Sequence, residues 1–210
     1  MSQDVVSFAG TAPRLALSAT LTVDAIGDIV CPFCFIGKRR MDTALEAVQG
    51  PVERNWYQWQ LNRELPVDGM DFDDYLVERF GSEKAVQPIL DNLKHEGKAV
   101  GIGFRFDRIQ RMPNTLRAHQ LLYMAESRGL DAVEIADDLM SAFFEQGRDI
   151  GDVEVLAKVG LRHGIPTGDV IAGLDNEKTR KAVLACERQV RDSGVAAVPA
   201  NLLNRRLLIV

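Results

Sequence analysis

The sequence predicts an α/β fold in which a strand–helix–strand unit is followed by a large helical insertion. Two alternating apolar segments flank a helical pattern between residues 20 and 61. Residues 66–164 then show almost continuous helical periodicity, with Asp, Asn or Ser at the helix starts and Gly at most ends. One more helix and two short apolar runs follow, so a β-hairpin is expected to complete the sheet.

The composition fits one globular unit. The 210 residues are 46% hydrophobic and 26% charged, which is enough for one domain that carries an insertion. The formal net charge of −5, with scattered Lys and Arg, gives no reason to expect nucleic acid or an anionic membrane as a partner. No apolar stretch in the sequence approaches the roughly 18 residues of a membrane helix.

Residues 1–19 are expected to form an N-terminal tail. They end in small residues but lack a basic segment and a continuous apolar core, unlike a signal peptide. We therefore expect a cytoplasmic protein, in a compartment where thiols are normally kept reduced. Three cysteines in 210 residues do not form a disulfide scaffold, so a cysteine motif needs a chemical explanation.

Three adjoining segments predict the first unit. Residues 20–30 alternate and then run apolar, which is typical of a strand. From Phe33 the apolar residues fall at helical spacing until Gly50-Pro51 stops the helix. Residues 52–61 are rich in Trp and Tyr and alternate again, so they predict a second strand. This order fits a β-α-β crossover.

The later elements follow from the same patterns. Helices are expected over about residues 71–80, 82–93, 113–129, 131–147 and 152–164, with a short extended piece at 101–106. A further helix is expected over 176–192, and Asn204-Arg205 separates the last two apolar runs as a hairpin turn does.

The chemistry is concentrated in Cys31-Pro32-Phe33-Cys34, at the junction of the first strand and helix. A cysteine at a helix N-terminus lies among unpaired N–H groups at the positive end of the dipole, and both stabilise its thiolate. Pro32 suits the first helical position. Cys34 lies one turn further on, within reach of a disulfide. We predict that Cys31 attacks a substrate disulfide and that Cys34 resolves the mixed disulfide.

A zinc site and a pair of core cysteines stay open as alternatives to redox chemistry. Zinc needs four ligands, usually from two such pairs. The remaining candidate ligands are scattered singly: Cys186, His95, His119 and His163. A pair of buried core cysteines explains neither the proline nor the position at a helix start. We therefore favour redox chemistry, with no metal and no cofactor besides the Cys31–Cys34 disulfide.

Three stretches of the sequence resemble a known family. DIVCPFCFIGKRR, MPNTLRAHQLL at residues 112–122 and SGVAAVP at 193–199 resemble the DsbA-like branch of the thioredoxin fold. Within it they are similar to the FrnE-like group of cytoplasmic dithiol–disulfide oxidoreductases. The resemblance covers about residues 20–208.

The resemblance implies a division of the chain and two departures from the family. Residues 20–65 and 165–210 would form the thioredoxin-like domain, and 66–164 a helical insertion domain. The family usually continues with aromatic and apolar residues after its cis-proline, whereas this chain has Ala200-Asn201-Leu202-Leu203. The sequence ends within the expected last strand, so we expect the C-terminal helix of the fold to be missing. An uncovered sheet face would favour a homodimer.

The resemblance also assigns roles outside the cysteine pair. Val198-Pro199 matches the position of the cis-proline beside the dithiol. The backbone of Val198 would pair with the substrate, and Pro199 would help to exclude metal. Phe33 is expected to be exposed and to tune the redox potential or offer an apolar contact. Asn114 borders the active-site groove in the family, although it most simply caps the helix after Pro113.

Three further residues have open roles. Asp28 can accept a proton near the thiols or be an ordinary turn residue. A single histidine on a helix, such as His119, is more often a packed or surface residue than a catalyst. Cys186 lies among Val and Leu residues and is favoured as a small core residue.

These observations lead to three functional hypotheses. The first is a thiol–disulfide oxidoreductase or isomerase that acts on protein or small-molecule disulfides, with glutathione as a candidate co-substrate. The second is a glutathione-dependent isomerase or transferase of the 2-hydroxychromene-2-carboxylate isomerase and kappa class, which shares the implied fold but typically carries Ser in place of Cys31. The third is a redox-inactive binding protein. The intact Cys31/Cys34 pair favours the first.

Overall fold

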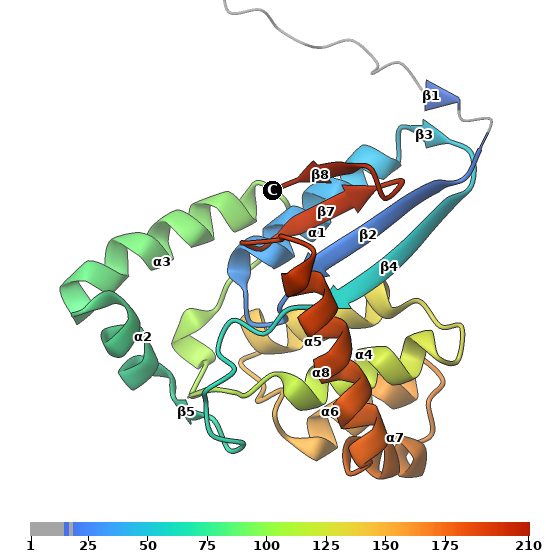
Figure 1. Cartoon of the computed structure of the whole chain (residues 1–210). Coiled ribbons are helices and arrows are strands. Elements are labelled where there is room, and N and C mark those ends of the chain that lie inside the picture. The colour runs from blue at the N-terminus through green and yellow to red at the C-terminus, as the bar shows by residue number, and fades with distance from the viewer. Residues whose placement is uncertain (1–14, 17–18) are drawn as a thin grey trace, which may run out of the picture.

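A four-stranded mixed sheet lies at the centre of the molecule (Figure 1). The structure is a computed structural model that describes residues 15–16 and 19–210. The strand order is β4-β2-β7-β8, with β2 parallel to β4 and β7 antiparallel to β2 and β8. The strands span β2 (Leu21–Gly27), β4 (Val52–Gln58), β7 (Ala200–Leu203) and β8 (Leu207–Ile209). Apart from residues 15–16 and 19, the predicted N-terminal tail lies outside the described residues.

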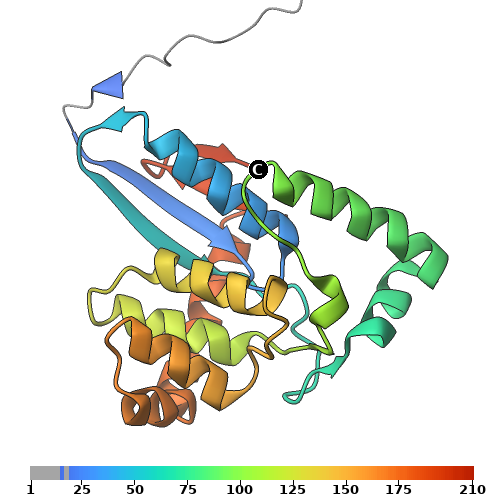
Figure 2. The ribbon, with the colours of Figure 1, turned by 180° about the vertical axis from the view of Figure 1, so that it is seen from behind.

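Helices cover both faces of this sheet. The helix α8 (Glu177–Asp192) lies in front of the sheet in Figure 1, whereas α1 (Pro32–Leu45) lies in front when the molecule is seen from behind in Figure 2. The parallel β2–α1–β4 crossover predicted from the sequence is confirmed. The helix α1 ends earlier than expected, because residues 48–49 form the short strand β3 (Val48–Gln49), which pairs with β1 (Leu15–Ala16).

The insertion between β4 and α8 is mainly helical. Its helices are α2 (Phe72–Phe80), α3 (Glu83–Lys98), α4 (Leu116–Glu126), α5 (Ala132–Phe144), α6 (Val153–Arg162) and α7 (Thr167–Leu174). A two-strand pair, β5 (Met70–Asp71) with β6 (Arg111–Met112), and a 3₁₀ turn, η1 (Phe106–Arg108), complete it. In both views α2 and α3 project away from the other helices as an arm.

Local capping signals explain which helices the sequence predicts. Ser82, Asp131 and Asp152 each accept a hydrogen bond from a first-turn N–H, so the predicted starts of α3, α5 and α6 are confirmed. The helix α7 has no such signal, because its N-cap is Pro166 without a side-chain hydrogen bond, and it was not predicted. The piece expected at 101–106 is turn and loop that leads into η1 rather than a strand. Among the described residues, no helix combines the length and apolar character needed to cross a bilayer.

The main apolar core joins α1 to the insertion. Phe35 of α1 packs against Phe104 and Phe144, with ring centroids 6.2 and 6.1 Å apart. The same buried cluster contains both Cys31 and Cys34. A smaller cluster, formed by Ile26, Trp59, Val190, Val195 and Ala200, lies between the sheet and α8. The dithiol therefore lies within the core that the two parts of the chain share.

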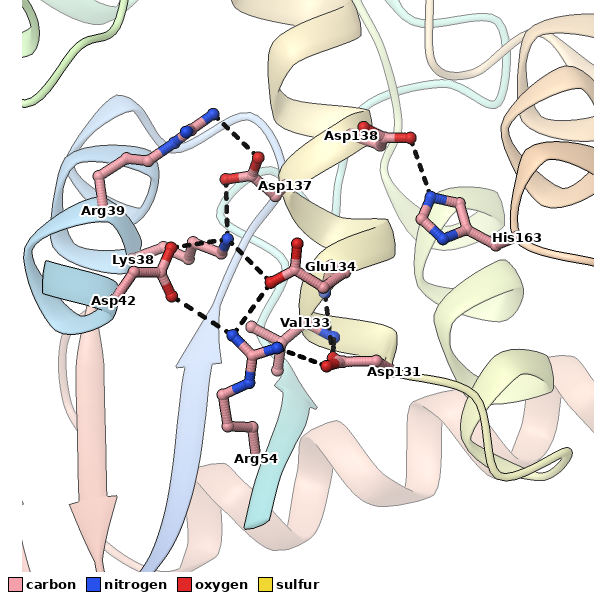
Figure 3. Close-up of polar contacts among 10 residues, drawn as sticks. All are labelled: Lys38, Arg39, Asp42, Arg54, Asp131, Val133, Glu134, Asp137, Asp138 and His163. Atoms are coloured by element: carbon pink, nitrogen blue, oxygen red, sulfur yellow. Dashed lines mark hydrogen bonds and ion pairs between the residues drawn. The ribbon is translucent and has the colours of Figure 1, made fainter. Parts of the chain in front are cut away.

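A network of ion pairs also connects α1 to α5 (Figure 3). The Lys38 side chain is only 6% exposed, and its Nζ lies 2.8 Å from Asp42, 3.1 Å from Asp137 and 3.3 Å from Glu134. Burial alone would lower the pKa of Lys38, but the hydrogen bonds and charges of Asp42 and Asp137 outweigh it, and the pKa is raised. Arg54 of β4 extends the network by pairing with Glu134.

Replacing the buried cation at the centre of this network is expected to destabilise the fold. Lys38→Met keeps the apolar stem but leaves three carboxylates without their shared partner. Breaking a fully buried pair costs about 3–5 kcal/mol, and the partial exposure of the carboxylates reduces this to about 2–3 kcal/mol. Urea unfolding at pH 7 measures the change in the free energy of unfolding.

The matched control is Lys158→Met, which removes an exposed i,i+4 pair with Glu154 and is expected to change stability by less than about 0.5 kcal/mol. Because the folded-state pKa of Lys38 is raised above 10.5, its contribution is present at lower pH and lost as the pH rises through the folded value. The difference between wild type and Lys38→Met should therefore shrink in strongly alkaline solution. Equal losses in the two variants at pH 7 would contradict this account.

Candidate active site

Cys31 is the N-cap of α1, as the sequence predicts, and Pro32 is the first helical residue. The Sγ atom of Cys31 accepts a hydrogen bond from the backbone N–H of Cys34 at 3.3 Å. Both cysteines are free thiols, and they retain only 4% and 3% of their exposed surface. This arrangement places the first sulfur at the positive end of the helix dipole, where an anion is stabilised.

Cys34 packs against the end of β2. A Cβ atom added to Gly27 would lie 3.0 Å from the Cys34 Sγ, so this sulfur packs tightly against the strand at a glycine. Burial is the main cause that raises the pKa of Cys34, and the hydrogen bond and charge of Cys31 raise it further. Cys34 is therefore held as a neutral thiol, while the sulfur of Cys31 lies at the start of the helix.

Asp28 and His119 form a buried contact beside the dithiol. Both residues are 0% exposed, and the Nε2 atom of His119 lies 3.0 Å from Oδ1 of Asp28. The same carboxylate accepts the N–H of Ile29 at 2.8 Å and the N–H of Leu61 at 2.7 Å. Asp28 is thus more than a turn residue, and His119 is packed, as the sequence favoured. Their contact was not predicted, because the two residues lie far apart in the chain.

A groove lies between the 61–66 loop and α2. Its volume is about 560 Å³, and its lining residues are Leu61, Asn62, Arg63, Glu64, Leu65, Pro66, Met70, Tyr75, Glu78 and Arg79. The Tyr75 hydroxyl donates a hydrogen bond to Asn62 at 3.3 Å. Burial chiefly raises the pKa of Tyr75, and the charges of Asp28 and Cys31 add to this. Neither cysteine lines the groove, and Tyr75 is the lining residue on which the charge of Cys31 acts.

The remaining predicted site residues lie around this centre. The Val198–Pro199 peptide is cis, as the resemblance implied. Pro199 packs against α1 at Gly37, where an added Cβ would lie 3.3 Å from the proline ring. Val198 is half-buried against both apolar clusters. Phe33 is 52% exposed, as expected. Gly37 lies one turn after Cys34, so Pro199 contacts the helix close to the dithiol.

Asn114 lies beside the groove, whereas Cys186 lies away from it on α8. The Asn114 Oδ1 accepts the N–H of Leu116, so it caps α4, although Thr115 occupies the N-cap position. Its Nδ2 donates to the carbonyl of Leu65 at 2.8 Å and so supports one wall of the groove. Cys186 is half-buried on α8, across the sheet from α1. Within the described part of the chain, no three His, Cys, Asp or Glu side chains gather as a metal site.

The chain is similar to several known proteins. Residues 22–210 match the DSBA-like thioredoxin domain. A probable DsbA oxidoreductase from Streptomyces coelicolor, SCO1869, is 27% identical, with a TM-score of 0.81 over 90% of this chain and 82% of that one. The cytosolic disulfide reductase DsbM of Pseudomonas aeruginosa with GSH has a TM-score of 0.62 at 14% identity, over 90% and 89% of the two chains. YwbO of Bacillus subtilis (strain 168) is 24% identical over 186 residues, which are 88% of this chain and 87% of YwbO.

Proposed function

The chain belongs to the DSBA-like thioredoxin domain family, and on this premise we propose that it is a thiol–disulfide oxidoreductase or isomerase that works through Cys31 and Cys34. The observation that carries the proposal is the position of the Cys31 sulfur. It lies at the start of α1, where it accepts the Cys34 N–H, with a second thiol buried one turn behind it.

The proposed reaction has two exchange steps. The Cys31 thiolate attacks one sulfur of the substrate disulfide, and the other substrate sulfur leaves as a thiolate. The Cys34 sulfur, after losing its proton, then attacks the Cys31 sulfur and releases the second substrate thiolate. The dithiol loses two electrons, the substrate disulfide gains them, and two protons pass to the substrate thiolates. The reverse sequence oxidises a substrate dithiol, and release of a wrong pairing allows isomerisation.

The proposed substrate class is based on the access of a disulfide to the Cys31 sulfur and on the charged side chains of the groove. Because Cys31 is only 4% exposed, a slender disulfide reaches its sulfur more readily than one held inside a folded protein. Arg63 and Arg79, which line the groove together with Glu64 and Glu78, offer cations to carboxylates. We propose a small or extended disulfide with carboxylate groups, and oxidised glutathione fits this description. The fold shared with DsbM, whose structure contains GSH, is consistent with this substrate.

The glutathione-dependent isomerase or transferase of the 2-hydroxychromene-2-carboxylate isomerase and kappa class is the second candidate. A thiol at position 31 with a resolving thiol at 34 favours the redox reaction. Such an isomerase would bind glutathione without changing the oxidation state of either cysteine, so the rate at which the reduced protein is oxidised separates the two functions.

The test compares two small disulfides that differ in charge. Reduced wild type should be oxidised by both oxidised glutathione and the neutral 2-hydroxyethyl disulfide. Arg79→Gln should lower the second-order rate constant with oxidised glutathione by about threefold to tenfold, because one ion pair to a carboxylate is lost, and leave that with the neutral disulfide unchanged. Samples are quenched with acid and alkylated, and mass spectrometry then gives the fraction of oxidised protein at each time.

Arg162→Gln is the control, because Arg162 is an exposed arginine of α6 that pairs with Asp138 and does not line the groove. It should leave both rate constants unchanged. Oxidation by neither disulfide would contradict the redox function and favour the isomerase. Equal losses with both disulfides in Arg79→Gln would contradict the carboxylate-binding role of the groove while leaving the redox function standing.

A further inference from the structure

We propose that Glu187 of α8 is a positioning residue that fixes Arg63 at the groove, and that this arrangement makes the protein prefer disulfides that carry carboxylates. The inference rests on the proposed function, because it concerns the substrate specificity of the same site. Arg63 binds the carboxylate of the substrate, and Glu187 acts only through Arg63. Glu187 lies outside the cysteine motif and does not line the groove.

Glu187 is a fully buried carboxylate. Its side chain is 0% exposed. A buried carboxylate is costly unless a cation and hydrogen bonds compensate its charge. Arg191, one turn further along α8, supplies the cation, since its Nε and Nη2 donate to Oε1 of Glu187 at 3.2 and 2.8 Å. The charge of Glu187 is therefore compensated before Arg63 is considered.

Gln60 connects this carboxylate to the segment that leads into the groove. The backbone N–H of Gln60 donates to Oε1 of Glu187 at 3.0 Å, and its Nε2 donates to Oε2 at 2.8 Å. Arg191 holds the same residue from the other side, because its Nη2 donates to the carbonyl of Gln60 at 2.8 Å. Gln60 is buried. The backbone at residue 60 therefore has a fixed position relative to α8.

Arg63 lies between the buried carboxylate and the groove. Its Nε lies 3.7 Å from Oε2 of Glu187, its side chain is 48% exposed, and it lines the groove. Because Nε is the atom that faces Glu187, the two Nη groups remain for a substrate carboxylate, which a guanidinium can bind with two hydrogen bonds. Since Arg191 already compensates Glu187, the three side chains together keep a net positive charge that an anionic substrate can neutralise.

The same segment is also anchored on the side of the dithiol. The N–H of Leu61 donates to Oδ2 of Asp28 at 2.7 Å, and the carbonyl of Asp28 accepts the N–H of Cys31 at 3.2 Å. Residues 60–61 are thus held both by α8 and by the turn before Cys31. Arg63 consequently has a defined place relative to the reactive sulfur, which lowers the conformational entropy that substrate binding must remove.

Arg79 is the matched comparison within the groove. It lines the same groove from α2 and acts on the phenol of Tyr75. The ion pairs of Glu187 in the described structure are with Arg63 and Arg191, so Arg79 is not held by this carboxylate. Removing the charge of Glu187 should therefore reduce the contribution of Arg63 to substrate binding and leave that of Arg79 intact.

The test measures a selectivity ratio, the rate constant for oxidation of the reduced protein by oxidised glutathione divided by that for 2-hydroxyethyl disulfide. Glu187→Gln keeps an oxygen that can accept the Gln60 N–H but loses the charge that holds Arg63. The ratio should fall about threefold to tenfold in the folded variant, as expected for one ion pair to a carboxylate. The loss of a negative charge without any effect on position would raise the ratio instead. An unchanged or raised ratio would overturn the proposal.

Two double-mutant cycles separate positioning of Arg63 from a general structural role. Arg63→Gln alone should lower the ratio by a similar factor, and Glu187→Gln added to it should change the ratio by less than about 1.5-fold. Added to Arg79→Gln, Glu187→Gln should again lower the ratio about threefold to tenfold, because the two sites are independent. If the effects were additive in both cycles, Glu187 would not act through Arg63, and the proposal would be overturned.

Arg63→Lys tests the same idea without changing a buried residue. Lysine keeps the charge but not the planar fork, so the ratio should fall about threefold. An unchanged ratio would show that only the charge matters and would contradict the positioning role.

Arg188→Gln is the control, because Arg188 is an exposed arginine next to Glu187 on α8 and does not line the groove. It should change the ratio by less than about 1.5-fold, and a loss equal to that in Glu187→Gln would contradict the proposal. Failure of the wild type to react with either disulfide would instead contradict the proposed function, so the two failures are distinguishable.

Discussion

Cys31→Ser is expected to lower the rate of disulfide exchange with oxidised glutathione by at least about 10³-fold. The hydroxyl that replaces the thiol has nearly the same size, so the start of α1 and the shared core should persist. It is, however, not ionised at the helix start, and a hydroxyl is a far weaker nucleophile than a thiolate. The measurement is the second-order rate constant for adduct or disulfide formation by the reduced protein at pH 7.

Cys186→Ser is the matched control for this variant. Cys186 is a free cysteine that is half-buried on α8, away from the dithiol, and burial raises the pKa of its thiol. Its replacement should change the rate constant by less than about twofold, which fits a substitution away from the site. If exchange survived in Cys31→Ser and disappeared in Cys186→Ser, the reactive thiol would have been assigned to the wrong residue.

Cys34→Ser is expected to arrest the reaction after the first step. In the wild type, the resolving sulfur lies one turn behind Cys31 on α1, and well-oriented internal groups can act with effective molarities of about 10⁵ M or more. In the variant, only free thiols in solution can release the mixed disulfide. Its lifetime at millimolar glutathione should therefore lengthen by more than about 10³-fold. The first step should keep a rate constant within a few-fold of the wild type, because Cys31 still lies at the helix start.

The arrested adduct also tests which sulfur attacks the substrate and which one resolves the mixed disulfide. An adduct that decays as fast in Cys34→Ser as in the wild type would show that Cys34 does not resolve it. An adduct that fails to form would show that Cys34, rather than Cys31, makes the first attack. The first outcome would contradict the resolving role of Cys34, and the second would contradict the nucleophilic role of Cys31.

The parts of the fold that the sequence predicts are those with local signals. Pro32 after Cys31 marks the start of α1, and acidic or hydroxyl caps mark the starts of several insertion helices. The turn at Asn204-Arg205 has both residues at positive φ, as a tight hairpin requires, and it joins β7 to β8. The cis peptide before Pro199 came only from the resemblance, because propensity alone favours trans.

The parts that were missed depend on contacts between distant residues. The helix α7 has no side-chain cap, and β3 exists because it pairs with β1. The Asp28–His119 contact joins residues 91 positions apart, and no local pattern encodes such a pairing. The groove likewise forms only when the 61–66 loop folds against α2. The division at residues 65 and 164 and the narrower FrnE-like assignment stay predictions.

The most direct test of the account is the mass of Cys34→Ser after incubation with oxidised glutathione at neutral pH, followed by peptide mapping. The account predicts one glutathione per chain, attached to Cys31, with Cys186 unmodified and the adduct stable until a reducing agent is added. An unmodified protein, or glutathione attached to Cys186 with Cys31 free, would contradict the claim that Cys31 at the start of α1 is the nucleophile of a thiol–disulfide oxidoreductase.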